Sequence, residues 1–237
     1  MKTMLVVTLI VLCVAASVGQ AHASPAFSES TKRAVFLSPL EGWYQTWNLD
    51  TYVSVLQKAG YQVDVFLNEN VSIAFLETGL SNYDLIILRT DSFSYEGAQY
   101  FCAGDPVTPE SPGTFAAQIL LQEVHVSACV GFSLNFIQHN YSPGSLHGLV
   151  YVLASSAYQL SYAFHSAGAS VFVGFGTDFS LRWGRMDAMT QKFFSYLADG
   201  YSVNDASMRL SLYLYSGHGI TANWVPISWV GDGNYKI

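Results

Sequence analysis

The sequence predicts an α/β domain built on a mostly parallel sheet with helices on both faces. Three observations lead to this prediction. Short, almost wholly apolar runs recur along the chain, as is typical of strands buried on both sides. Segments with apolar residues at helical spacing lie between these runs. Their alternation favours parallel strands joined by right-handed crossovers.

The first part of the domain shows this alternation most clearly. The expected strands cover residues 34–38, 61–67 and 84–88. Between them lie two segments with the apolar spacing of helices. The first begins after Asn48 and ends at Gly60, and the second begins after Asn70 and runs to about residue 77. Asn is a favoured N-cap because its side-chain oxygen accepts a backbone N–H of the first turn.

Residues 91–112 interrupt the pattern with three prolines and several Gly and Ser residues, which predicts a long loop region with one hairpin. The alternation then resumes. The expected strands are residues 124–129, 149–153 and 170–173, and the expected helices are residues 114–122, 134–138, 158–166 and 186–197. Gly200 ends the last helix. Since no linker or repeat is visible, one domain is expected.

The N-terminus has the features of a secretory signal peptide. Lys2 precedes an apolar stretch over residues 4–18, and Ala21-His22-Ala23 offers a small-residue cleavage site. The alternative is a retained anchor, but about 15 apolar residues are short against the ~20 of a spanning helix. We therefore expect a signal peptide over residues 1–23, a domain over residues 24–237, no integral membrane span after signal removal, and an extracellular or cell-surface location.

The composition limits the partners. Only 11% of the residues are charged, against about 25% in an average soluble domain, and the formal net charge is −7. No cluster of Lys and Arg is present, which argues against nucleic acid or anionic lipid. A surface made of Ser, Thr, Asn, Gln, Gly and Tyr carries little electrostatic repulsion. Such a surface favours self-association.

The cysteines and sequons fit an exported protein. Cys13 leaves with the signal peptide, so Cys102 and Cys129 are the remaining pair. In an oxidising compartment such a pair forms a disulfide more often than a metal or catalytic site. The sequons at Asn70 and Asn140 permit glycosylation where the host has the machinery.

Several motifs together resemble a known group of proteases. A helix leads into Ala-Gly-Ala-Ser-Val-Phe-Val-Gly-Phe over residues 167–175, and Gly231-Asp232-Gly233 lies near the end of the chain. With the order of strands and helices, this resembles the caspase, clostripain and gingipain clan of cysteine peptidases over roughly residues 32–237. The resemblance is greatest to a caspase-like family known from archaeal genomes. It implies a caspase-like, mostly parallel sheet.

The resemblance also implies where catalytic residues should lie. In that clan one strand ends in a His-Gly pair and a neighbouring strand ends in a Cys. Here the matching positions hold Asp91-Ser92 and Ser155. A carboxylate with a pKa near about 4 is a poor base for a serine hydroxyl. We therefore expect Asp91 and Ser155 to lie near each other at the ends of adjacent strands, in a site that has lost catalysis.

Other candidate sites are weaker. Cys129 and His125 lie four residues apart, about 13 Å along a strand. His218, within Gly-His-Gly, follows every cysteine, the reverse of the clan's order. No metal site or cofactor is expected. A turn is expected at Gly174-Phe175-Gly176. The remaining histidines, His139, His147 and His165, share no metal-ligand spacing. Turn or cap positions, or alternatively calcium ligands, are expected for Asp178, Asp187, Asp199 and Asp205.

Three functions remain open at this stage. The leading one is a secreted, catalytically inactive domain that assembles with itself into an extracellular structure such as a surface layer or sheath. The second is a module that binds a peptide or glycan in the vacated cleft through Trp43, Tyr44 and Trp47. The third is a residual cysteine or serine endopeptidase.

Overall fold

The computed structural model describes residues 31–41, 49–176, 183–215 and 227–237. From residue 31 onward, contacts gather the chain into one compact unit. The expected signal peptide, residues 1–23, and the first residues of the expected domain lie outside the described residues. Within the described ranges, no helix combines the length and the apolar character that crossing a bilayer requires.

The larger of two sheets has six strands in the order β10-β9-β8-β3-β1-β2. These strands are β1 (Arg33–Ser38), β2 (Gln62–Leu67), β3 (Leu85–Arg89), β8 (Leu149–Leu153), β9 (Val171–Gly174) and β10 (Ser228–Gly231). All neighbouring pairs are parallel except β10, which runs antiparallel to β9. The predicted α/β class with a mostly parallel sheet is thereby confirmed.

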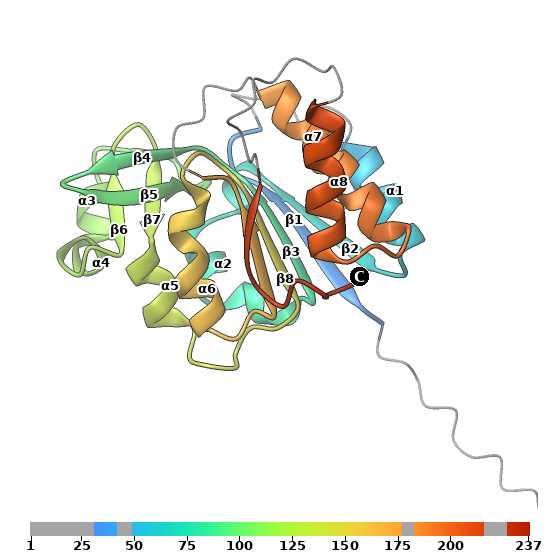
Figure 1. The fold of residues 1–237 in the computed structure, drawn as a ribbon. Helices are drawn as coiled ribbons and strands as arrows, with labels where there is room; N and C mark the ends of the chain where they lie inside the picture. The colour runs from blue at the N-terminus through green and yellow to red at the C-terminus, as the bar shows by residue number, and fades with distance from the viewer. Residues whose placement is uncertain (1–30, 42–48, 177–182, 216–226) are drawn as a thin grey trace, which may run out of the picture. The chain divides into compact units, whose positions relative to one another are not determined.

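Helices cover both faces of this sheet (Figure 1). On one face lie α1 (Leu49–Lys58), α7 (Trp183–Ala198) and α8 (Val203–Tyr215), and on the other lie α2 (Ile73–Thr78), α5 (Leu134–Asn140) and α6 (Ser161–Ser166). Strand β3 contributes to both cores. Leu85 and Ile87 pack on the side of α7 and α8, while Ile86 and Leu88 pack on the side of α5 and α6. Burial on both faces explains the continuous apolar run.

The chain segment between β3 and β8 forms a second sheet. Its four antiparallel strands have the order β4-β5-β7-β6. They are β4 (Ser92–Tyr95), β5 (Ala98–Cys102), β6 (Val124–Val126) and β7 (Val130–Ser133), and the short helices α3 (Ser111–Thr114) and α4 (Ala116–Leu120) lie between β5 and β6. The expected hairpin is confirmed as β4 and β5. The expected strand over residues 124–129 is shorter, because Ser127 turns back toward β7 with its N–H on the carbonyl of Cys129.

Further local predictions differ from the structure. The expected cap at Asn70 is wrong, because Asn70 ends the short helix η1 (Asn68–Asn70) and the Ser72 hydroxyl accepts the N–H of Phe75 at 3.1 Å to start α2. Asn48, the other expected cap, lies outside the described residues. The remaining short helices are η2 (Gly79–Asn82) and η3 (Ala157–Leu160). The sequence patterns did not predict α3, β7, α8 or β10.

The disulfide predicted between Cys102 and Cys129 is confirmed, with Cα atoms 5.7 Å apart. Cys102 ends β5, and Cys129 directly precedes β7. Both cysteines are buried, and Leu40 and Phe93 pack against them. The bridge therefore fixes the turn between β6 and β7 to the end of β5.

Replacing both cysteines with serine should lower the free energy of unfolding. The bridge closes a loop with a sequence separation of 27 residues, for which chain entropy predicts a loss of about 3 to 4 kcal/mol. Urea denaturation of the oxidised wild-type protein and of the double variant measures the difference. Wild-type protein kept in a reducing agent is the control, and it should match the variant. An unchanged stability would mean that the bridge contributes nothing to the fold.

Candidate functional site

The carboxyl edge of the larger sheet brings Asp91 and Ser155 together. Strands β3 and β8 pair in parallel, with Arg89 opposite Leu153. The pairing continues past the strands, since the N–H of Thr90 donates to the carbonyl of Leu153 at 3.0 Å. The hydroxyl of Ser92 then donates to the carbonyl of Ser155 at 2.7 Å. The two residues thus follow neighbouring strands, and the catalytic loss assigned to them stays a prediction.

Asp91 and its neighbours connect the two sheets. The Asp91 carbonyl accepts the N–H of Cys102 at 3.0 Å, and the Thr90 hydroxyl donates to the carbonyl of Cys102 at 2.7 Å. The Asp91 carboxylate accepts the N–H of Ser92 at 2.8 Å. Thr90 and Asp91, just after β3, are therefore hydrogen-bonded to Cys102 at the end of β5 in the second sheet.

The chain leaves β8 through a tight turn at Ser155 and Ser156. Ser156 has a φ of 57°, in the left-handed region that non-glycine residues rarely occupy. Its N–H donates to the carbonyl of Gly176 at 3.3 Å, and the N–H of Tyr158 donates to the carbonyl of Phe175 at 2.9 Å. The residues after β9 thus hold the turn in place. Such backbone costs about 1 to 3 kcal/mol and persists where surrounding contacts determine it.

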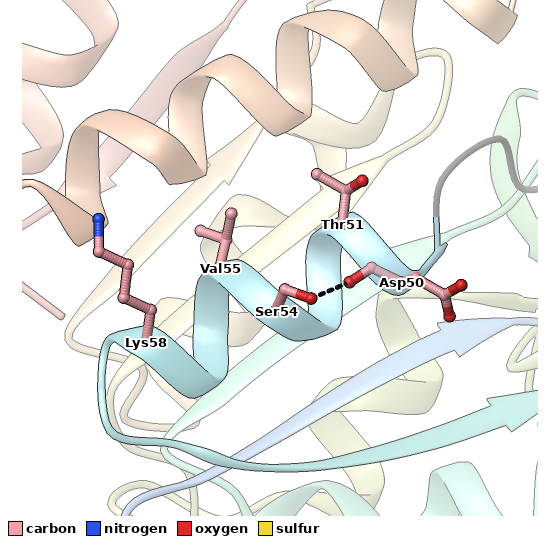
Figure 2. Close-up of a pocket in the computed structure, with 5 residues that line it drawn as sticks. All are labelled: Asp50, Thr51, Ser54, Val55 and Lys58. Carbon is pink, nitrogen blue, oxygen red and sulfur yellow. Dashed lines mark hydrogen bonds between the residues drawn. The ribbon is translucent and has the colours of Figure 1, made fainter.

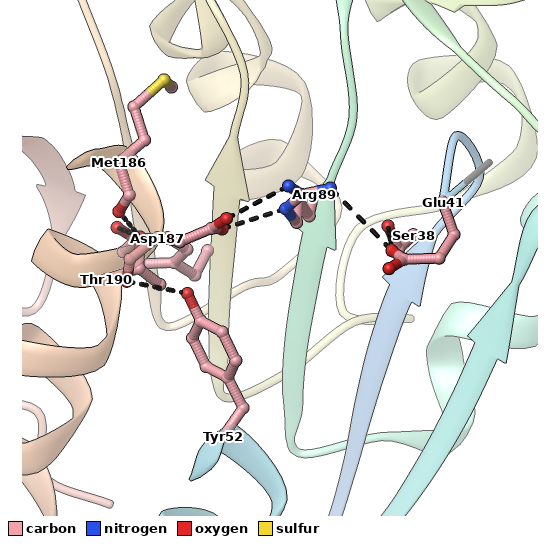
Figure 3. A network of polar contacts seen from close by, with 8 residues as sticks. Ser38, Glu41, Tyr52, Arg89, Met186, Asp187 and Thr190 are labelled. Atoms are coloured by element: carbon pink, nitrogen blue, oxygen red, sulfur yellow. Dashed lines mark hydrogen bonds and ion pairs between the residues drawn. The ribbon is translucent and has the colours of Figure 1, made fainter. Parts of the chain in front are cut away.

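A buried ion pair lies directly beside this edge (Figure 3). Arg89, the last residue of β3, is 1% exposed and reaches Asp187 of α7 through two hydrogen bonds of 2.9 and 3.1 Å. A carboxylate oxygen of Glu41 lies 4.0 Å from the same guanidinium and accepts a hydrogen bond from the Ser38 hydroxyl. The expectation that Asp187 is a turn or cap residue is wrong, because it lies inside α7 and is 2% exposed.

Hydroxyl groups extend this polar network into the core. Tyr52 donates to the backbone carbonyl of Asp187 at 3.0 Å, and the hydroxyls of Tyr151 and Thr190 lie 2.8 Å apart. Burial raises the pKa of Asp187, and the guanidinium of Arg89 opposes that rise. Burial also raises the pKa of Tyr52 and of Tyr151 well above the ordinary range, so both stay neutral. The network is structural in character.

Among the described residues, no histidine makes an identified contact with Ser155. Each of the four has a partner elsewhere: His125 stacks on Tyr95, His139 pairs with Glu123 at 2.8 Å, His147 pairs with Asp84 at 3.1 Å, and His165 approaches the carbonyl of Ala169 at 3.2 Å. Asp84 precedes β3 and therefore lies at the opposite edge of the sheet. Cys129 as a nucleophile is ruled out in the oxidised protein because its sulfur is bonded to Cys102.

Several other candidates can now be placed. Asp205 lies in the first turn of α8 and is not itself the cap: the Ser202 hydroxyl caps the helix by accepting the N–H of Asp205 at 3.2 Å, and it donates to the Asp205 carboxylate at 2.8 Å. Asp199 pairs with Lys58 on the surface at 3.8 Å. Among the described residues, no three His, Cys, Asp or Glu side chains converge on a metal position. The candidates outside the described residues are Trp43, Tyr44, Trp47, Asp178 and His218.

A shallow hollow of about 310 Å³ runs along α1 and is lined by Asp50, Thr51, Ser54, Val55 and Lys58 (Figure 2). The Ser54 hydroxyl donates to the carbonyl of Asp50 in its own helix at 2.6 Å. The lining residues all come from one exposed helical face. This arrangement supplies no combination of groups suited to catalysis.

Comparison with solved structures finds caspases among those similar to this chain. The initiator caspase Dronc of Drosophila has a TM-score of 0.44 and 11% identity, covering 86% of this chain and 80% of that chain. Caspase-1 of Spodoptera frugiperda also has a TM-score of 0.44 and 11% identity, covering 84% and 85% respectively. Neither a family model nor a curated protein matches the chain. At 11% identity these similarities concern the fold and say nothing about activity.

Replacing Asp187 with alanine should destabilise the protein by about 3 to 5 kcal/mol, because Arg89 would be left as a buried charge without its partner. Urea denaturation measures the loss. Asp199→Ala is the matched control and should change stability by less than about 1 kcal/mol, since its ion pair is exposed.

A double variant separates charge burial from packing. Arg89→Met with Asp187→Leu removes both charges and should lose less stability than Asp187→Ala alone. If the double variant is the less stable of the two, the pair itself stabilises the fold beyond what apolar packing provides.

Proposed function

We propose that this chain is an exported, catalytically inactive domain with a caspase-like arrangement of strands, and that it acts by associating with further copies of itself. One observation carries the catalytic part. The neighbouring strand ends at which the resemblance places a His and a Cys hold Asp91 and Ser155. Two neighbouring parallel strands therefore end in an aspartate and a serine in place of the two catalytic residues that the resemblance implies.

The available groups are poor replacements for a cysteine and a histidine. A serine hydroxyl needs a base whose pKa is near neutrality, which an ordinary aspartate does not have. Both cysteines beyond the expected signal peptide are joined to each other, so the oxidised protein has no thiolate to act as nucleophile. The hydroxyls of Thr90 and Ser92, beside these positions, are engaged in hydrogen bonds between the two sheets.

Self-association is supported by the surface of the domain. Met208 and Leu212 lie one turn apart on α8 and are 54% and 63% exposed. Tyr158 and Tyr162 have the same spacing at η3 and α6, on the opposite face of the sheet, and are 42% and 70% exposed. Two different apolar patches on opposite faces permit head-to-tail contacts, which form rings or open arrays. With 11% charged residues, little repulsion opposes such contacts.

The purified mature protein should not cleave peptides, because its edge lacks both the thiol and the imidazole. A fluorogenic peptide library, incubated with wild-type protein and with Ser155→Ala, tests this expectation. Equal background rates in both samples are expected. Cleavage by the wild type that disappears in Ser155→Ala would contradict the proposal and favour the residual endopeptidase.

The protein should form species larger than a monomer in a concentration-dependent way, as measured by sedimentation velocity over a hundredfold range. Met208→Glu with Leu212→Glu should reduce these species because it puts two charges into the α8 patch. Leu120→Glu is the control, since Leu120 is 86% exposed on α4 of the second sheet region and belongs to neither patch. A wild-type protein that stays monomeric at all concentrations would contradict self-association.

A further inference from the structure

The second sheet has an aromatic outer face that the proposed function does not use. Cross-strand pairing puts Phe93 opposite Tyr100 and His125 opposite Gly131. The rings of Phe93 and Tyr100 stack with centroids 5.6 Å apart, and Tyr95 stacks on His125 at 3.8 Å. The alternate residues of the same strands face the other way, into the core: Phe101, Phe132, Val124 and Val130.

Gly131 makes this aromatic cluster sterically feasible. A Cβ atom at Gly131 would lie 2.7 Å from the ring of Phe93 and 3.0 Å from the Cβ of Tyr100. The glycine therefore leaves the space in which the ring of Phe93 lies across the sheet. Rings from the two outermost strands, β4 and β6, meet over this position.

A hollow of about 300 Å³ opens beside the cluster. Its lining combines aromatic and aliphatic surface with a carboxylate and an amide, and consists of Tyr95, Glu96, Ala98, Tyr100, Ile119, Leu120, Gln122, Val124 and His125. Its volume is at the lower end of the ~300–1,000 Å³ usual for small-molecule sites. Among the described residues that line it, Glu96 is the one acidic side chain, and none is Lys or Arg.

Glu96 and Gln122, which supply the carboxylate and the amide of the hollow, have unusual backbone conformations. Glu96 has a φ of 47° and, with Gly97 at 82°, forms the two-residue turn between β4 and β5. Asn, Asp or Gly is favoured at its position in such a turn. Gln122, just beyond α4, has a φ of 56°, where Gly or Asn is usual. Turn geometry therefore does not account for the choice of Glu and Gln, whose longer side chains border the hollow.

We propose that this hollow binds a neutral sugar unit of a glycan. The Tyr95 side chain is 45% exposed and stacks on His125 with one face, which leaves the other face for the apolar C–H surface of a pyranose ring. Glu96 supplies hydrogen-bond acceptors for sugar hydroxyls, and the amide of Gln122 supplies both donors and acceptors. The carboxylate disfavours acidic sugars.

A cationic side chain is the competing ligand, because aromatic rings and a carboxylate also attract cations. The arrangement of the rings favours the sugar. Tyr95 and His125 lie nearly parallel, 22° apart, so they cover each other and do not enclose a cation between several ring faces. The neighbouring Glu96 carboxylate also raises the pKa of the Tyr95 hydroxyl.

The test is a glycan array of neutral, N-acetylated, sialylated and sulfated oligosaccharides, probed with the mature protein and followed by titration of the best soluble binder. Binding confined to neutral or N-acetylated glycans is expected. Tyr95→Ala should weaken it by about tenfold, through loss of the stacking surface. Val65→Ala is the control, because Val65 is exposed on β2 and belongs neither to the hollow nor to the association patches, and it should leave binding unchanged.

Two further variants separate binding from folding. Glu96→Asn and Gln122→Gly introduce residues that these backbone conformations favour, so their thermal midpoints should equal or exceed that of the wild type. Each should nevertheless weaken the glycan by about fivefold, the effect of losing one hydrogen bond.

No binding on the array, binding of acidic glycans only, or binding that survives Tyr95→Ala would overturn the proposal. A hexa-arginine peptide that binds through Tyr95 and Glu96, while no glycan does, would assign the hollow to cations instead. The outcome does not depend on self-association, since the Met208→Glu, Leu212→Glu variant keeps the hollow intact.

Discussion

The buried pair of Arg89 and Asp187 fixes the part of the fold on which the rest depends. Arg89 is the last residue of β3 and lies three positions before Ser92, with which the second sheet begins. Asp187 comes from α7, on the other side of a long stretch of chain. Because an unpaired charge is far more costly in the core than at the surface, α7 and the end of β3 must meet in this one register. The positions of Asp91 and Ser155 follow from that register.

The sequence predicts the larger sheet well because its strands are buried on both faces and appear as apolar runs. The ion pair was not predicted, because the apolar run ends at Leu88, just before Arg89, and Asp187 lies 98 residues from Arg89 in the sequence. A signal was nevertheless present. Asp187 shares a helical stripe with Thr190 and Phe194, all of them buried, and an acid on an apolar stripe indicates a buried partner. The sequence does not show which basic residue pairs with Asp187, whereas the structure identifies Arg89.

The second sheet was harder to predict for a different reason. Strands of three to five residues are too short to display alternation clearly, and the order β4-β5-β7-β6 joins residues that helices α3 and α4 separate in sequence. The disulfide could be predicted from the number of cysteines alone. The aromatic outer face could not, because Tyr95 and His125 come from the two outermost strands of a sheet whose pairing the sequence does not reveal.

The edge that resembles a protease site serves here as a junction between sheets. Thr90, Asp91 and Ser92 each direct a polar group to β5 or to the end of β8, and the disulfide secures β5 a few ångströms away. A catalytic edge needs polar groups that remain available to substrate, whereas a junction needs them satisfied by one another. The hydrogen bonds found at these residues meet the second requirement. The same hydrogen bonds connect the second sheet to the larger one, so the inactive edge and the binding role of the second sheet that we propose are compatible in one domain.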